Sequence, residues 1–309
     1  MVNVNKDKQI NTEKRMKIKT NTSTKVFYTV GYILVIALAL FCVIPFIMMI
    51  SGSLSDNGEI VKHGYSLLPR GFSTRAYTSL FEYPDQILRA YGVTIVTTVI
   101  GTVVGLLLTS MAGYVLARKD FKQRNGVGFM IYFTTLFGGG LVPWYIVLTS
   151  VLHLKNSYWG LIIPMLLSPF NIFLFKNFLK SVPDSLIESA RIDGAGDFYI
   201  YWKIVLPLAK AALATIGLFT ALGYWNDWYL SSLLITDPNK YKLQFLLNNI
   251  LQNSQYMAQA SLAGAAQKTM PSETVKLATA IIVTGPVVLF YPFAQRYFVE
   301  GLTIGSVKG

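Results

Sequence analysis

Long apolar runs separated by polar segments make up most of the chain. Six of these runs have about 20 residues or more, the length that an α-helix needs to cross a hydrocarbon core of about 30 Å. The runs cover residues 26–50, 91–117, 127–151, 158–178, 209–235 and 275–297. This pattern predicts an all-α membrane protein with six transmembrane helices.

The amino-acid composition supports the membrane interpretation. Hydrophobic residues make up 53% of the chain and charged residues 14%, whereas a soluble domain carries about a quarter charged residues. The first run, 26–50, is longer than the apolar core of a signal peptide, which has about 7–15 residues. We therefore expect an uncleaved first span, with a basic tail at 1–25 and one six-span domain at 26–309.

The basic residues favour one orientation of these spans. They are dense in the tail 1–25, between spans two and three, and between spans four and five. On the other side the basic residues are scattered, and two of the three loops there, 51–90 and 236–274, are long. Because cytoplasmic loops carry the excess of Lys and Arg, both termini and the segment 180–207 are predicted to be cytoplasmic. This sorting by membrane side argues against a nucleic-acid partner despite the net charge of +12.

The segment 180–207 has the features of a short helix that ends in a turn. Pro183 suits the first turn, where its missing N–H costs nothing. Asp184 and Glu188 place negative charge near the positive end of that helix. Gly194 is able to adopt the left-handed conformation that stops a helix. A second helical piece is expected before the fifth span, and a proline breaks or kinks its entry.

The spacing from Glu188 to Pro207 reads E-x-A, three residues, Gly, nine residues, then I-x-L-P. It resembles the cytoplasmic coupling loop of ABC importer permeases, where the membrane subunit docks on its ATPase. The alternative is an ordinary re-entrant or interfacial loop. Ser189 stands where the family usually has alanine, and serine is small enough to keep such a docking surface. The resemblance assigns ATPase coupling to Leu186, Ile187, Glu188, Ser189, Ala190, Asp193, Gly194, Ile204, Leu206 and Pro207.

Further motifs extend the resemblance over nearly the whole chain beyond the basic tail. They are Leu-Pro-Arg-Gly-Phe-Ser at 68–73, the glycine-rich run at 137–145, the segment 156–161 and Trp-Asn-Asp-Trp at 225–228. They look like carbohydrate-type permeases with the ABC type I importer fold, and most like those for complex oligosaccharides in Gram-positive bacteria.

Membership in that group implies a location in the cell membrane and a set of partners. The partners are a second homologous permease, a cytoplasmic ATPase dimer, an extracellular sugar-binding lipoprotein, the oligosaccharide and membrane lipid. ATP and Mg²⁺ would belong to the ATPase, so no cofactor is expected in this chain. The outer loop 236–274 would then reach toward the binding protein.

The sequence shows no motif that is typical of catalysis, nucleotide binding or metal binding. It has no phosphate-binding loop of the G-x-x-x-x-G-K-[ST] type, so it is not expected to be an enzyme. Cys42 is the only cysteine, and His63 and His153 stand apart, so no metal site is expected. The spans are nearly free of ionisable groups apart from Asp227, which disfavours a stand-alone secondary carrier. An ABC permease for another solute is the nearer alternative.

Two segments are candidates for the substrate path. Trp225, Asn226, Asp227 and Trp228 could bind a sugar through aromatic faces and polar oxygens, but an interfacial aromatic belt is the commoner explanation for such residues. Gly139 and Gly140, inside Gly-Gly-Gly at 138–140, suggest a broken helix beside a covered cavity. Close packing of helices through small residues is the commoner explanation there.

Overall fold

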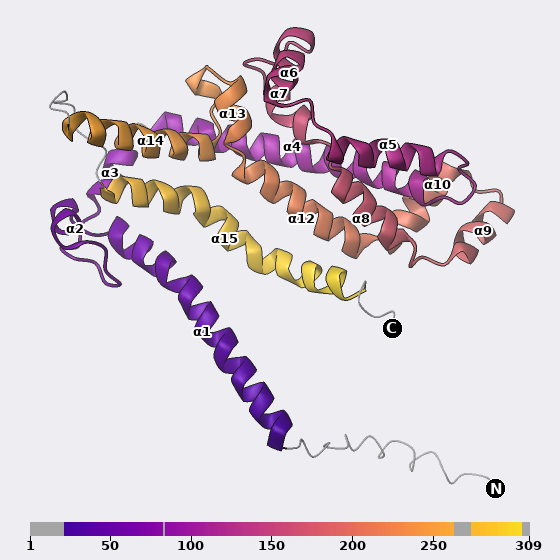
Figure 1. Cartoon of the computed structure of the whole chain (residues 1–309), viewed down its shortest axis with the longest axis horizontal. Helices are drawn as coiled ribbons and strands as arrows, with labels where there is room; N and C mark the ends of the chain where they lie inside the picture. The colour runs from indigo at the N-terminus through magenta and orange to yellow at the C-terminus, as the bar shows by residue number, and fades with distance from the viewer. Residues whose placement is uncertain (1–21, 83, 263–272, 305–309) are drawn as a thin grey trace, which may run out of the picture.

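The structure is a computed structural model of the 309-residue chain, and it describes residues 22–82, 84–262 and 273–304 (Figure 1). Most of the predicted basic tail and residues 263–272 of the predicted outer loop lie outside this range. Every named element in the described range is a helix, and an isolated antiparallel bridge joins Ser55 to Phe72. The prediction of an all-α protein is confirmed.

The elements follow one another in this order: α1 (Thr22–Ser53), α2 (Asn57–His63), α3 (Arg75–Leu80), α4 (Pro84–Ala117), α5 (Arg124–Leu136), α6 (Leu141–Ile146), η1 (Val147–Val151), α7 (Tyr158–Ile162), η2 (Ile163–Met165), α8 (Pro169–Leu179), α9 (Asp184–Ile192), α10 (Asp197–Ile200), η3 (Tyr201–Val205), α11 (Leu206–Leu208), α12 (Lys210–Asn226), α13 (Tyr229–Leu234), η4 (Pro238–Lys240), α14 (Leu243–Leu262) and α15 (Glu273–Ile304).

Three helices in the described range are long and apolar enough to cross a membrane, and the number rises to six if each of three bent helix pairs is one span. The three straight candidates are α1, α4 and the first part of α15, which match the first, second and sixth predicted spans. The bends are 113° between α5 and α6, 47° between η2 and α8, and 82° between α11 and α12.

The third predicted span is bent by 113°, and its glycines are not crowded by other helices in the described part of the chain. A Cβ added at Gly138 or Gly140 would meet nothing within 4 Å, and at Gly139 it would meet only Pro143 Cβ at 3.9 Å. Gly140 has φ of +85°, a conformation that L side chains rarely adopt. The backbone therefore turns sharply at these glycines.

The fifth span is shorter than the predicted run 209–235. α12 ends at Asn226, and Asp227 leaves the helical conformation with ψ of 112°. Asp227 Oδ1 accepts a hydrogen bond from Leu230 N at 3.1 Å, so this side chain satisfies the start of a separate helix, α13. Hydrophobicity continues through the break, which is why the run alone does not reveal it.

α4 is the central helix, because it packs against both α12 and α8. A row of small residues four apart makes this approach possible, and all of them are buried: Thr97, Gly101, Gly105, Thr109 and Gly113. A Cβ at Gly101 would lie 2.3 Å from Tyr224 Cζ, and a Cβ at Gly105 would lie 3.0 Å from Leu166 O. Small residues let helices approach closely where lipid offers no hydrophobic driving force.

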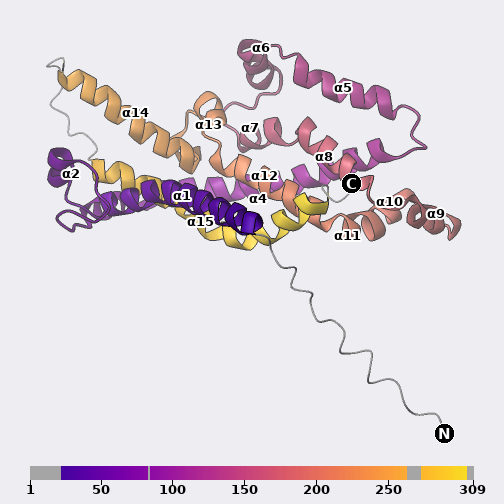
Figure 2. The same ribbon diagram turned by 60° about the horizontal axis from the view of Figure 1, so that its bottom comes forward.

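Other helices surround this centre on opposite sides. α5 lies on one side of the pair α4 and α12, while α1 and α15 lie on the other (Figure 2). None of the most apolar 18-residue stretch of α1 is buried, as expected for a helix that faces lipid or another subunit. α9 and α10 lie at one end of the long axis, and α2, α3 and α14 lie at the opposite end (Figure 1).

Candidate functional site

α9 is a short helix between α8 and α10. It begins after Pro183, whose φ of −61° and ψ of 128° are those of the residue before the first turn. At the other end, Ala195 N donates to Ala190 O at 2.9 Å, and Gly194 N donates to Arg191 O at 3.0 Å. These two bonds form a Schellman motif, which needs a left-handed residue after the helix. Gly194 supplies it with φ of +84°, so this glycine ends the helix as predicted.

The two faces of α9 have different surroundings. Ile187 and Ala190 pack against the buried apolar cluster that contains Phe175. Leu186 and Ile192 point away from it and are 45% and 87% exposed. The remaining predicted residues of this helix and its cap are exposed as well: Glu188, Ser189, Asp193 and Gly194. One face therefore holds α9 on the protein, and the other is open to a partner.

The expected second helical piece consists of α10, η3 and α11 in succession. Ile204 and Leu206 pack against the same cluster as Ile187, while Pro207 is exposed. Pro207 has no N–H to donate to the preceding turn, and the chain then bends by 82° into α12. The predicted break before the fifth span is confirmed, and two predicted coupling residues face the protein's own core.

Three exposed aromatic residues beside α9 are absent from the sequence prediction. Phe198, Tyr199 and Trp202 are 68%, 58% and 45% exposed. The rings of Phe198 and Trp202 meet edge to face, with centroids 6.1 Å apart. Their helical spacing, opposite the buried Ile200 and Val205, was the available signal. They extend the open surface of α9 with apolar area.

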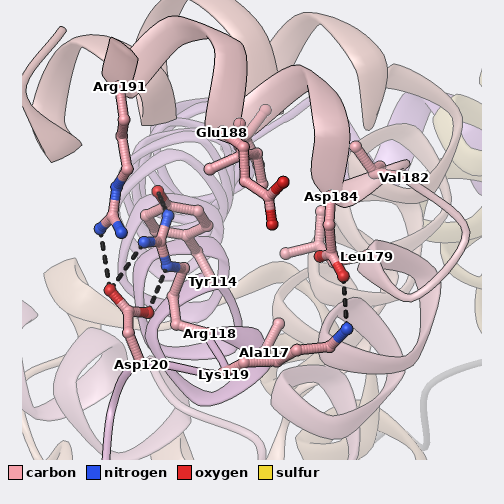
Figure 3. Close-up of a pocket in the computed structure, with 12 residues that line it drawn as sticks. Tyr114, Ala117, Arg118, Lys119, Asp120, Leu179, Val182, Asp184, Glu188 and Arg191 are labelled. Atoms are coloured by element: carbon pink, nitrogen blue, oxygen red, sulfur yellow. Dashed lines mark hydrogen bonds and ion pairs between the residues drawn. The ribbon is translucent and has the colours of Figure 1, made fainter. Parts of the chain in front are cut away.

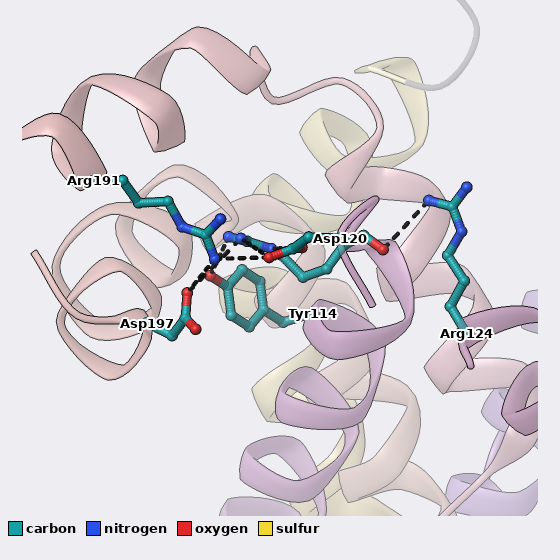
Figure 4. A network of polar contacts seen from close by, with 6 residues as sticks. Tyr114, Asp120, Arg124, Arg191 and Asp197 are labelled. Carbon is teal, nitrogen blue, oxygen red and sulfur yellow. Dashed lines mark hydrogen bonds and ion pairs between the residues drawn. The ribbon is translucent and has the colours of Figure 1, made fainter. Parts of the chain in front are cut away.

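Four charged side chains join α9 and α10 to the segment after α4 (Figure 4). Arg118 holds Asp120 through Nε to Oδ1 at 2.9 Å and Nη2 to Oδ2 at 2.8 Å. Arg191 donates from Nη2 to Asp120 Oδ2 and to Asp197 Oδ1, both at 2.8 Å. Arg118 Nη2 also lies 3.8 Å from Asp197 Oδ1. We call Arg118, Asp120, Arg191 and Asp197 the ionic cluster.

Mutual hydrogen bonding keeps the ionic cluster charged. The bonds from Arg118 and Arg191 hold the pKa of Asp120 well below its ordinary value. The bond to Asp120 raises the pKa of Arg118, and the bonds to Asp197 and Asp120 raise the pKa of Arg191. Arg118, Asp120 and Arg191 therefore carry their charges at neutral pH.

A cavity of about 160 Å³ separates α9 from the end of α4 (Figure 3). The ionic cluster lies at one side of it, and an ion pair between Lys119 and Asp184 lies at the other. The Glu188 carboxylate lies between these two groups without an ion-pair partner in the described part of the chain (Figure 3). This carboxylate is available to a cation from outside the chain.

Asp227, at the break between α12 and α13, is fully engaged within the protein. Its Oδ1 accepts the hydrogen bond from Leu230 N, and its Oδ2 accepts one from Lys242 Nζ at 3.1 Å. Lys242 is completely buried and also donates to Tyr224 O. Both carboxylate oxygens of Asp227 therefore have protein partners in this structure.

The other residues of the Trp-Asn-Asp-Trp segment point in different directions. Trp225 Nε1 donates to Val283 O at 3.2 Å, which places this indole between α12 and α15. Asn226 Oδ1 accepts from Gln244 Nε2 at 3.1 Å. Trp228 is 42% exposed. The structure thus does not bring these four side chains together on one surface.

The break in the third span lies beside the end of the fifth. Gly139 and Gly140 line a groove of about 490 Å³ together with Trp144, Tyr229 and Leu230. Trp144 and Tyr229 contribute aromatic side chains to its lining. The groove is thus lined by Gly139 and Gly140 of one predicted substrate-path segment and by Tyr229, which directly follows Trp228 of the other segment.

Comparison of the sequence with models of protein families identifies the family of this chain. The model of the binding-protein-dependent transport system inner membrane component matches residues 105–304, which include α9 and the bends on either side of it. The chain belongs to this family. It is the permease of a binding-protein-dependent ABC importer.

Individual relatives match almost the full length of the permease. It is 40% identical over 285 residues to the polygalacturonan/rhamnogalacturonan transport system permease protein YtcP of Bacillus subtilis, covering 92% of this chain and 99% of that one. It is 40% identical over 268 residues to protein LplC of the same organism, covering 86% and 90% of the two chains. A solved bacterial ABC transporter involved in the import of the acidic polysaccharide alginate matches with a TM-score of 0.77 and 31% identity, over 90% of this chain and 99% of that one.

Several properties follow from the family. The permease is a multi-pass protein of the cell membrane, and a permease component is not itself an enzyme. A binding-protein-dependent ABC system also implies an ATPase and a binding protein. Within the described residues, no group of three or more His, Cys, Asp or Glu side chains could hold a metal ion.

Proposed function

We propose that the permease forms half of the translocation pore of an ATP-driven importer for an oligosaccharide. The observation that carries this proposal is 40% identity, over 92% of the chain, to a permease named for polygalacturonan and rhamnogalacturonan. The solved relative named for alginate import supports the same substrate class. A second, homologous permease would supply the other half of the pore.

In this proposal the open face of α9 docks on the cytoplasmic ATPase dimer, which binds ATP and Mg²⁺. Its centre is Leu186, Glu188 and Ile192, which are exposed on a helix whose opposite face is held in the core. Apolar side chains surrounded by polar ones are typical of protein interfaces. The unpaired Glu188 carboxylate offers a contact for a cation of the ATPase.

The transport mechanism that we propose is alternating access. Closure of the ATPase pair on ATP would move α9, which is held on α8 and η3 through their shared apolar cluster. The movement would pass through the bend before α12 into the spans and open the pore on the outer side. The oligosaccharide would then leave the binding protein and enter between the two permeases.

The outer end of the molecule is the proposed docking side for a sugar-binding lipoprotein. α14 extends there from its buried attachment at Lys242 and Leu243. This orientation puts both termini in the cytoplasm, in agreement with the dense basic residues near α9. The two Bacillus subtilis relatives support a Gram-positive host.

Two other functions fit less well. A stand-alone secondary carrier needs ionisable groups near the membrane midplane, and the candidate here, Asp227, is paired with Lys242. An importer of another solute would share the coupling loop, so only the transported substrate separates it from the proposal.

The proposal is tested by purification of the tagged permease from its native membrane, followed by uptake in proteoliposomes. We expect an ATPase, a second permease and a binding protein to co-purify, and ATP-dependent uptake of oligogalacturonides or another oligosaccharide in a panel of acidic and neutral sugars. Leu186→Asp and Ile192→Asp should remove the ATPase, because they place charge on the proposed interface.

Val61→Asp is the matched control, since Val61 is 68% exposed at the opposite end. Loss of the ATPase in Val61→Asp, or its retention in both α9 variants, would contradict the docking surface. Uptake of peptides or amino acids in place of every sugar would contradict the substrate class.

A further inference from the structure

The ionic cluster is attached to α4 through Arg118, whose side chain is more buried than that of a typical surface ion pair. The Arg118 side chain is only 12% exposed. Its Nη1 donates to Tyr114 Oη at 3.0 Å, and its guanidinium lies 5.6 Å from the centre of that ring. The Tyr114 ring in turn packs against Tyr201 of η3, with centroids 5.6 Å apart. Arg118 is therefore held by the buried Tyr114, which is itself packed against Tyr201 of η3.

The same elements are joined one turn deeper in α4. Tyr201 Oη and Ser110 Oγ are hydrogen-bonded at 2.7 Å, and both side chains are buried. Ser110, Tyr114 and Arg118 follow one another at intervals of four residues on one face of α4 and its continuation. This face forms a continuous line of polar and aromatic contacts from α4 to the segment that carries α9.

Asp120 completes that line toward α9. It accepts from Arg118 on one side and from Arg191 on the other. Apolar contacts, such as those of Ile187 with the core, are non-directional and allow sliding. A carboxylate held by two guanidinium groups has a set geometry, and a bidentate bond adds to its strength. Asp120 therefore bridges Arg118 and Arg191 and connects the end of α4 to α9 through directional bonds.

We propose that Asp120 is the positioning residue that transmits movement of α9 to α4, through its bonds to Arg191 and Arg118. The inference rests on the proposed function of α9 as the ATPase contact. Because α4 packs against α12 and α8, α4 distributes this movement to the helices around the pore. The ionic cluster then provides a second connection through which movement of α9 reaches the spans, in addition to the bend before α12.

The test measures how much sugar enters per ATP hydrolysed, in the complete transporter reconstituted with its binding protein. The variants are Asp120→Ala, Arg191→Ala and the double variant. We expect each single variant to keep its ATPase subunit but to lower the sugar-to-ATP ratio about fivefold or more. The double variant should fall no further than the singles, because each single variant already breaks the bond between Asp120 and Arg191.

Lys122→Ala is the matched control, because Lys122 is an exposed cation in the same segment as Asp120. A sugar-to-ATP ratio in Asp120→Ala equal to that of Lys122→Ala overturns the proposal. Additive losses in the double variant also overturn it. Asp120→Asn keeps the side-chain shape without the charge and decides the outcome if the alanine variant accumulates poorly.

These outcomes differ from a failure of the proposed function itself. If no ATPase co-purifies with the unmodified permease, the docking role of α9 is wrong, whatever the variants do. If the ATPase co-purifies with every variant and the ratio is unchanged, the docking role stands and the role of Asp120 is wrong. A merely structural role would lower the amount of assembled transporter without changing the ratio.

Discussion

Lys242 Nζ lies 3.1 Å from Asp227 Oδ2, and the two side chains are 0% and 8% exposed. This buried ion pair joins the start of α14 to the break between α12 and α13. Beside it, Leu243 N donates to Thr94 Oγ1 of α4 at 2.9 Å. α14 is therefore attached to the centre of the molecule by polar contacts that are shielded from water.

Lys242→Met should destabilise the permease by about 3–5 kcal/mol, because it leaves a buried carboxylate without its cation. The double variant Lys242→Met with Asp227→Asn should recover most of this loss, since no buried charge remains. Thermal unfolding of the purified permease measures both. Lys155→Met, at an exposed lysine, is the control, and a single variant as stable as this control would contradict the structural role of the pair.

Gly101→Ala and Gly92→Ala should have opposite effects although both lie in α4. Alanine in a helix interior is ordinarily more favourable than glycine by about 1 kcal/mol. At Gly92 an added Cβ meets nothing within 4 Å, whereas at Gly101 it would lie 2.3 Å from Tyr224 Cζ. The Tyr224 ring is held in place, because its hydroxyl donates to Ile162 O at 2.7 Å.

We therefore expect Gly101→Ala to lower stability by about 1–3 kcal/mol through overpacking. Gly92→Ala should be neutral or stabilising. The two unfolding midpoints, measured side by side, check this. Equal midpoints would mean that α4 and α12 do not approach each other as closely as the structure has them.

Gly194→Ala should weaken ATP-driven uptake, because it strains the end of α9. An alanine in the left-handed conformation costs about 1–2 kcal/mol, and Gly194 has φ of +84°. Gly196→Ala is the matched control, since Gly196 has φ of −72° and open space around it. Uptake and ATPase co-purification should fall in the first variant and stay near the unmodified level in the second. The reverse order would show that the Schellman motif is not what α9 needs.

The contribution of Asp120 to stability should be constant near neutral pH. Its folded pKa lies below the ordinary value, so its stabilising effect is present above about pH 4, the unfolded pKa. The effect is lost as the pH falls further and the carboxylate is protonated. The neighbouring Arg118 and Arg191 stay charged throughout this range, because their pKa values are raised.

The difference in unfolding midpoint between the unmodified permease and Asp120→Asn should therefore be the same at about pH 6 and pH 8. It should shrink only below about pH 4. A difference that changes between pH 6 and pH 8 would mean that another titrating group controls the ionic cluster.

The hydrophobic pattern was sufficient for the helical class and the candidate spans, and the proline, acidic residues and glycine of segment 180–207 were sufficient for the short helix between the fourth and fifth. These features depend on local chemistry: apolar length, a proline before the first turn and a glycine after the last. The spacing from Glu188 to Pro207 was also enough to indicate the family. The predicted end of the fifth span at 235 was wrong, because hydropathy continues through Asp227 while the helix ends at Asn226, where Asp227 accepts a hydrogen bond from Leu230 N.

Only the tertiary structure decided which predicted site residues are accessible and which charges meet. Sequence spacing selects Ile187 and Leu186 equally, but one packs in the core and the other is exposed. Asp120 and Arg191 are 71 positions apart along the chain and meet at 2.8 Å. The sequence determines what each segment tends to form, because those preferences are local. Pairings between distant side chains arise only when packing of α4 against its neighbours brings them together.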